Sequence, residues 1–185
     1  MRKALAWCLA LGALAVTLAA QDNVNQGSLT LQDFSKRVAA YVKINRAAAS
    51  KIPSLKRTGT PEAIAIHERK LASAIRRARP NAAQGEVFTP EIATRFRELI
   101  AEAMRGSSAE RIHESLRQAA PVWLSTMRVN MTYPHEVPLQ SSPPTLLANL
   151  PQLPAQVEYR FVGNSLILRD LEANLIVDFI RDAIR

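Results

Sequence analysis

The chain has 185 residues, of which 48% are hydrophobic and 22% are charged, with a formal net charge of +8. This composition suits an ordinary globular core and gives no sign of a chain that is disordered throughout. The single cysteine, Cys8, lies within the first twenty residues, so a chain processed there contains no disulfide and depends on packing alone.

The first twenty residues have the order of a secretory signal peptide. Arg2 and Lys3 precede the uncharged run 4–20, which consists mostly of Ala and Leu and ends in Ala19-Ala20. We therefore expect cleavage after Ala19 or Ala20 and an exported protein, periplasmic or extracellular. An uncleaved membrane anchor is the alternative, although a span needs roughly 20 apolar residues. After removal of the signal, we expect no transmembrane span.

Charge is unevenly distributed along the rest of the chain. Residues 21–128 contain 18 Lys and Arg against 10 Asp and Glu, whereas residues 129–185 contain 4 against 6. The basic part either faces anionic envelope components or forms solvated helix faces that maintain solubility.

Four helices are predicted in residues 21–128. The first begins at Thr30, a capping residue with Asp33 three positions later, and ends before Pro53. Its expected apolar stripe consists of Leu31, Phe34, Val38, Tyr41 and Val42.

The second and third helices begin at the same tripeptide, Thr60-Pro61-Glu62 and Thr89-Pro90-Glu91. A capping hydroxyl, proline at the first helical position and an acid in the first turn all favour a helix start. The expected buried faces are Ile64, Leu71 and Ile75, then Ile92, Phe96, Leu99 and Ala103. A short fourth helix with Ile112 and Leu116 on its apolar side follows Ser107 and ends before Pro121.

In residues 123–131, apolar residues alternate weakly with other residues, as in a β-strand. A proline-rich linker is predicted at 129–156. Six of the eleven prolines fall between Pro134 and Pro154, which excludes a central strand. We expect an extended surface segment with one helical turn at Thr145 to Leu150.

The C-terminal part, 157–185, predicts a β-meander. Val157, Tyr159 and Phe161 alternate with polar residues, and Gly163-Asn164 forms a tight turn. A return strand with Leu166 and Leu168, a turn at 170–174 and a third strand at 175–180 complete it. Because so small a sheet needs a cover, the predicted fold is α+β, with the four-helix region packed on the antiparallel meander as one domain at 21–185.

No catalytic motif is found in the sequence, and no cofactor is expected. Asp170 and Asp178 could be taken for paired carboxylates, but a turn acid and a strand-end acid explain them. The best candidate for anion binding is a basic cluster of six residues, namely Lys51, Lys56, Arg57, Arg76, Arg77 and Arg79. Nucleic acid is an unfavourable partner, because stacking aromatics are scarce near this cluster.

Each of the three histidines, His67, His113 and His135, precedes a glutamate. None of them continues into the HExxH pattern of a zinc protease. His67 is predicted to be a partly buried packing residue. A metal site formed by the three histidines is the alternative.

The sequence shows two resemblances to known proteins. Residues 75–80 with 87–91, and residues 157–170, look like a family of uncharacterised exported bacterial proteins. Leu153-Pro154, Tyr159, Val162-Gly163, the run 166–168 and Ile176-Val177 are similar to the small hairpin of RcnB-type periplasmic proteins. The second resemblance implies a periplasmic setting and links to nickel and cobalt efflux, but none of its metal ligands has a counterpart here.

The sequence thus predicts a non-enzymatic exported protein, a binding or accessory module of the envelope. Its expected partner is an anionic envelope component or another envelope protein, bound by the basic side of the first two helices. Periplasmic handling of a nickel- or cobalt-type metal ion, through the three histidines, is the alternative.

Overall fold

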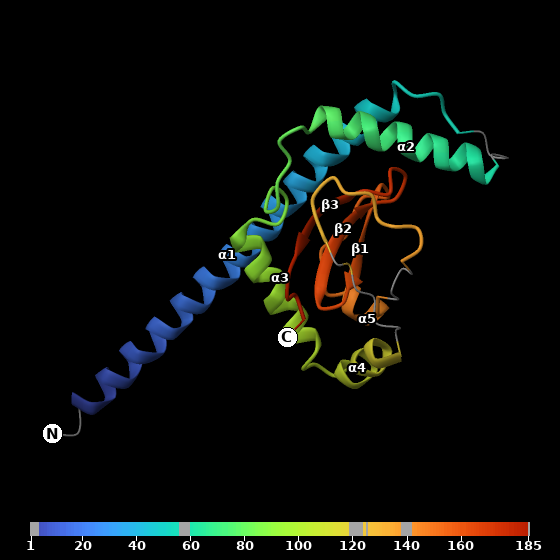
Figure 1. Ribbon diagram of the computed structural model, residues 1–185. Coiled ribbons are helices and arrows are strands. Elements are labelled where there is room, and N and C mark those ends of the chain that lie inside the picture. The colour runs from blue at the N-terminus through green and yellow to red at the C-terminus, as the bar shows by residue number, and fades with distance from the viewer. Residues whose placement is uncertain (1–3, 56–59, 119–123, 125, 138–141, 185) are drawn as a thin grey trace.

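The N-terminal part of the chain is helical and the C-terminal part forms a small antiparallel sheet (Figure 1). The computed structural model describes residues 4–55, 60–118, 124, 126–137 and 142–184, with side chains from residue 26 onward apart from 117. The helices are α1 (Ala4–Ala49), α2 (Pro61–Ala78), α3 (Pro90–Ala103), α4 (Ala109–Gln118) and α5 (Pro144–Leu147). The strands β1 (Val157–Val162), β2 (Ser165–Asp170) and β3 (Ile176–Ile180) are ordered β1-β2-β3. The predicted α+β class is confirmed.

Helix α1 begins much earlier than the sequence predicts. It is continuous from Ala4 to Ala49, so Thr30 lies inside it and is not its capping residue. The Thr30 hydroxyl instead donates to the carbonyl of Gln26, at 2.9 Å. Residues 21–29 contain no proline to stop the helix, and a threonine within a helix commonly bonds the carbonyl four residues earlier.

The starts of α2 and α3 are those that the sequence predicts. The hydroxyl of Thr60 accepts from the amide of Ala63, and that of Thr89 accepts from the amide of Ile92. Leu71 and Ile75 are buried as expected, but Ile64 is 48% exposed, which corrects its assignment to the buried face. Ile64 lies near the N-terminal end of α2, which extends beyond the sheet (Figure 1).

Replacing Thr89 with alanine is expected to lower the free energy of unfolding by about 1 kcal/mol, because the first turn of α3 loses its cap. Thr94 provides a matched control, since it lies within α3 and its hydroxyl only donates to the carbonyl of Pro90. Thr94→Ala should be neutral or slightly stabilising. Urea unfolding of both variants measures the difference, and equal effects would contradict a capping role.

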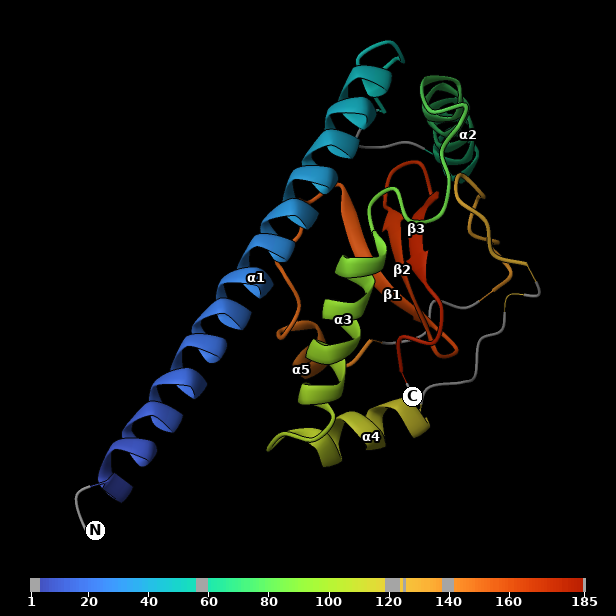
Figure 2. The same ribbon diagram turned by 90° about the vertical axis from the view of Figure 1, so that its left-hand side faces the viewer.

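Each face of the meander is covered, whereas the sequence predicts one covered face. On the first face, Phe34 of α1 lies 4.8 Å from Phe96 of α3 between ring centroids, and Phe96 lies 5.9 Å from Tyr159 of β1. On the second, Met127 and Tyr133 pack in one cluster with four sheet residues, namely Val162, Ile167, Ile176 and Phe179. Figure 2 shows α1 and α3 on one side of the sheet and the segment before α5 on the other.

The segment before α5 differs from both sequence predictions made for it. Its described part, 124 and 126–131, forms no strand; beside it only Thr132 makes a bridge, to Leu175. Trp123 and Ser125 lie outside the described residues. The linker is not a surface segment throughout, because Tyr133, Leu146 and Leu150 are buried. The single helical turn is confirmed as α5, and its buried Leu146 explains how a proline-rich chain is held on the core.

Candidate functional site

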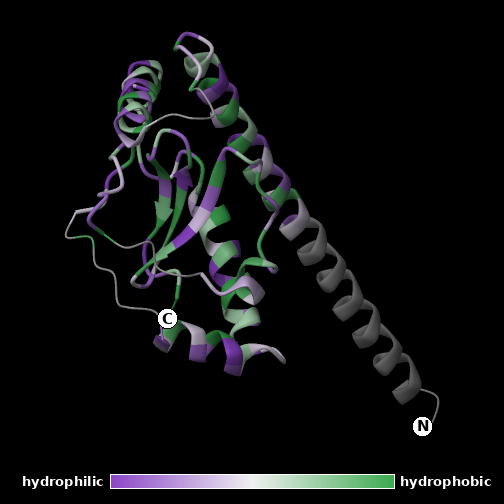
Figure 3. Ribbon diagram, turned by 90° about the vertical axis from the view of Figure 1, so that its right-hand side faces the viewer, coloured by the Kyte–Doolittle hydropathy of each residue, from purple (hydrophilic) through white to green (hydrophobic). Residues whose placement is uncertain are grey.

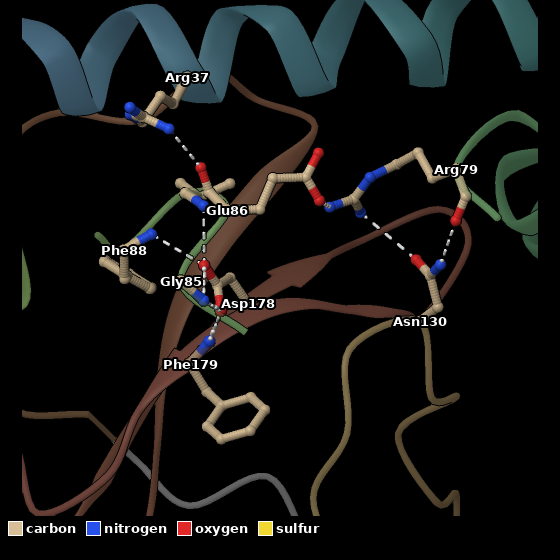
Figure 4. A network of polar contacts seen from close by, with 9 residues as sticks. Arg37, Arg79, Gly85, Glu86, Phe88, Asn130, Asp178 and Phe179 are labelled. Carbon is tan, nitrogen blue, oxygen red and sulfur yellow. Dashed lines mark hydrogen bonds and ion pairs between the residues drawn. The ribbon is translucent and has the colours of Figure 1, made fainter. Parts of the chain in front are cut away.

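Asp178 is a fully buried acid at the middle of β3, an edge strand of the sheet. It belongs to β3 and pairs with Leu168 of β2, which corrects its interpretation as a strand-end acid. Its Oδ2 accepts from the amides of Val87 and Phe88, each at 2.8 Å, and its Oδ1 accepts from its neighbour Phe179 (Figure 4). Asp178 therefore fastens the loop between α2 and α3 to the sheet.

Gly85 completes this arrangement from the same loop. Its amide also donates to Asp178, at 3.1 Å, and its backbone has a φ of +90°. This conformation favours glycine, because a side chain would be strained there. The loop thus presents three amides to one carboxyl group, from Gly85, Val87 and Phe88.

Asp170, the second buried acid, fastens α1 to the sheet. Its Oδ2 accepts from the hydroxyl of Tyr41 and from the amide group of Asn45, each at 2.6 Å. Its Oδ1 accepts from the backbone amides of Glu172 and Ala173, as expected for a turn acid. The two buried acids have no hydrogen-bond partner in common, so each one has a separate structural role.

The tyrosines should keep their protons until the protein unfolds at alkaline pH. Burial is the main cause that raises the pKa of Tyr41 above its ordinary 10.0. The charge of Asp170 and the hydrogen bond to it raise this pKa further. Burial also raises the pKa of Tyr159 and of Tyr133, the latter against the opposing charges of Arg169 and Arg160. Because only the unfolded chain loses these protons, the free energy of unfolding is unaffected below pH 10 and falls as the pH rises above it.

Ultraviolet absorbance of tyrosinate, recorded together with circular dichroism, measures this effect. We expect both signals to change in a single step above pH 10. A substantial tyrosinate signal from a protein that keeps its circular dichroism would contradict the prediction.

Arg76 and Arg79, two members of the predicted anion-binding cluster, are engaged inside the fold. The side chain of Arg79 is 3% exposed and donates to Glu86, at 2.7 Å, and to Asn130. Its guanidinium also lies over the ring of Tyr41, 4.9 Å from the centroid. Arg76 donates to the carbonyl of Asn130 and to the hydroxyl of Thr132. These two arginines thus hold the segment after α4 and are not free for an anion.

The other four members do not restore the predicted cluster, and Lys51 lies in the turn after α1. Arg77 is exposed at the end of α2 and donates to Ser73. Lys56 and Arg57 lie outside the described residues.

The three histidines occupy different surroundings. His67 of α2 is buried, more fully than the sequence predicts, with its Nε2 2.8 Å from Oε1 of Glu172. His135 is exposed and lies 3.1 Å from Glu68. His113 is on α4, beside a cavity of about 480 Å³ at the C-terminal end of α3. Among the residues that the structure describes, no three His, Cys, Asp or Glu side chains are grouped to hold a metal ion.

A basic surface is nevertheless present, on the side of α1 that faces away from the sheet. Exposed cations occupy this side and the turn that follows it, and we call them the cationic face: Lys36, Lys43, Arg46 and Lys51. Of these four residues, only Lys51 belongs to the basic cluster predicted from the sequence. The signal for Lys36 and Lys43 was present, because they lie opposite the apolar stripe in helical phase.

Comparison with known proteins leaves the chain without a relative from which to transfer a function. No family model matches it, and no curated protein and no solved structure is significantly similar. In the part of the chain that the structure describes, no helix is both long and apolar enough for a membrane span.

Proposed function

We propose that the protein is exported and works in the cell envelope as a non-enzymatic binding module for an anionic component. The order of a charged start, an apolar run at 4–20 and small residues at Ala19-Ala20 supports export. The binding surface is the basic side of α1 and α2.

The distribution of charge is the observation that carries the proposed binding role. Residues 21–59 contain seven Lys and Arg against two Asp, whereas the following residues, 60–128, contain eleven against eight. In addition, α1 lies at the outside of the fold, beside the sheet and α3 (Figure 2). A surface of one sign attracts partners of the other.

Expression of the full chain with a C-terminal tag in a bacterial host, followed by cell fractionation and intact-mass analysis, tests the proposal. We expect a product that lacks residues 1–19 or 1–20, is recovered with the envelope and is released by high salt. Full-length protein in the cytosol would overturn export, and an exported product with no salt-sensitive association would overturn the binding role.

A pair of leader variants controls for fortuitous secretion. Replacing Leu11 and Leu14 with arginine interrupts the apolar run and should retain the protein in the cytosol. Replacing the same two residues with isoleucine keeps the run apolar and should preserve export.

A further inference from the structure

The cationic face of α1 is regular. Lys36 and Lys43 are seven residues apart, about two helical turns, so they lie one above the other. Lys36 and Lys43 are about 10 Å apart along the helix axis, at 1.5 Å per residue, and Lys51 lies in the turn that follows α1. Between these cations the exposed side of α1 carries small residues, namely Ala39, Ala40 and Ala47. Short side chains there allow the helix to approach a partner closely.

The face is also free of opposing charge. The only acid in residues 26–55 is Asp33, which is ion-paired with Arg37 at 2.8 Å. Arg37 in turn donates to the carbonyl of Glu86 at the surface, so its charge is engaged within the fold (Figure 4). No ion pair within the described residues involves Lys36, Lys43 or Lys51. Their charge is therefore available to a partner.

The opposite side of α1 fixes the direction in which these cations point. Phe34, Val38 and Tyr41 are each at most 3% exposed and belong to the main core. Tyr41 and Asn45 are also bonded to Asp170, so α1 has little freedom to rotate about its axis. Figure 3 shows hydrophilic residues along the described part of α1 next to the hydrophobic ones.

The shape of this face determines which anionic partner it suits. The outer side of a single helix is convex and does not enclose an isolated anion, so a free phosphate would meet one lysine at a time. A broad, planar array of negative charge can meet the whole face together. The surface of a bilayer with anionic phospholipids is such an array, and each Lys or Arg near it contributes to binding. Between Lys36 and Lys51 the exposed side of α1 carries no bulky apolar side chain. Leu29, about two turns before Lys36 and 57% exposed, lies at one end of this face, so binding would be electrostatic along the face, with one apolar contact at its end.

From these observations we infer that the cationic face of α1 docks the protein on an anionic phospholipid bilayer surface, with α1 lying along the membrane plane. This inference rests on the proposed function, because it names the anionic component that an exported binding module would contact. Contact through Lys36, Lys43 and Lys51 uses the side of α1 opposite to the one that packs on the core.

Sedimentation of the purified, processed protein with vesicles tests the inference. The vesicles consist of phosphatidylcholine alone or of phosphatidylcholine with phosphatidylglycerol, at low and at high salt. We expect binding only to the anionic vesicles, and loss of that binding as salt screens the charges. The triple variant Lys36→Gln, Lys43→Gln, Lys51→Gln should bind them about a hundredfold more weakly, at roughly one factor of five per lysine.

A second triple variant removes equal charge elsewhere. It carries Arg105→Gln, Arg111→Gln and Arg128→Gln, three exposed positions outside α1 and α2. It should bind the anionic vesicles within about threefold of the parent protein. Circular dichroism must show that both triple variants are folded, and variants are compared at equal chain length so that any retained leader contributes equally.

Three outcomes would overturn the inference. The two triple variants could weaken binding equally, or the protein could bind both kinds of vesicle equally. In the third outcome, the triple lysine variant loses binding to a soluble polyanion such as duplex DNA but still binds the anionic vesicles. Any of these would leave export and salt-sensitive envelope association intact. Failure of the proposed function would be recognised separately, by cytosolic protein or by the absence of salt-sensitive association in the fractionation experiment.

Discussion

Replacing Asp178 with asparagine is expected to lower the free energy of unfolding by about 3 kcal/mol. The carboxyl group accepts from the amides of Gly85, Val87, Phe88 and Phe179, and it is fully buried. An asparagine side chain of the same shape has one oxygen and one NH₂ group. Its NH₂ group would face N–H donors, so at least one buried amide loses its acceptor, which is costly where water does not replace it.

Asp182→Asn is the matched control for this prediction. Asp182 is exposed, and its positive φ of 49° is one that asparagine tolerates. Its effect should stay within about 0.5 kcal/mol. Urea unfolding measures the stability of both variants, and amide hydrogen exchange at Val87 and Phe88 should accelerate in the Asp178 variant alone. Similar stabilities in the two variants would show that Asp178 does not hold the loop.

Elements defined by local chemistry could be predicted from the sequence. The caps at Thr60 and Thr89 require only neighbouring residues, so α2 and α3 begin where expected. The meander could likewise be predicted, since the alternation of apolar and polar residues and the Gly163-Asn164 turn fix its register within a few residues. Val162 and Ser165, the residues on either side of that turn, pair with each other.

Features that depend on distant parts of the chain could not be predicted in this way. Asp178 looks like a strand-end acid until the loop some ninety residues earlier supplies its donors. Arg79 looks like a free cation at a helix end, yet Glu86 and Asn130 surround it. The error at Thr30 has another origin, because a capping residue is equally compatible with a helix interior when nothing before it stops the helix.

The candidate site, too, could be predicted from the sequence only in part. The basic character of the region could be counted from the sequence, but its assignment to Arg76 and Arg79 was misplaced. Identification of Lys36 and Lys43 requires knowledge of which side of α1 is buried. The apolar stripe already contained that information, so the cationic face follows from helical phase once the core is known.

A double-mutant cycle between Tyr41 and Asp170 should show a coupling of at least about 1 kcal/mol. Tyr41→Phe removes a hydroxyl that donates to the buried carboxyl group at 2.6 Å, and we expect a loss of about 2 kcal/mol. Asp170→Asn should cost about 3 kcal/mol, because the turn amides of Glu172 and Ala173 and the side chain of Asn45 also donate to this group. The double variant should lose clearly less than the sum, since each replacement removes the bond between the Tyr41 hydroxyl and a carboxyl group. An asparagine at 170 keeps only one side-chain oxygen, which the turn amides of Glu172 and Ala173 also need.

Tyr159→Phe distinguishes this coupling from a general effect of removing a buried tyrosine hydroxyl. The Tyr159 hydroxyl donates to the carbonyl of Pro151, at 3.0 Å, and has no partner in common with Asp170. Its combination with Asp170→Asn should therefore be additive within about 0.5 kcal/mol. Additivity of both tyrosine variants would mean that the bond between Tyr41 and Asp170 contributes little to the attachment of α1. Coupling of Tyr41 alone would identify that bond as a contact that fixes the rotation of α1, and with it the direction of the cationic face.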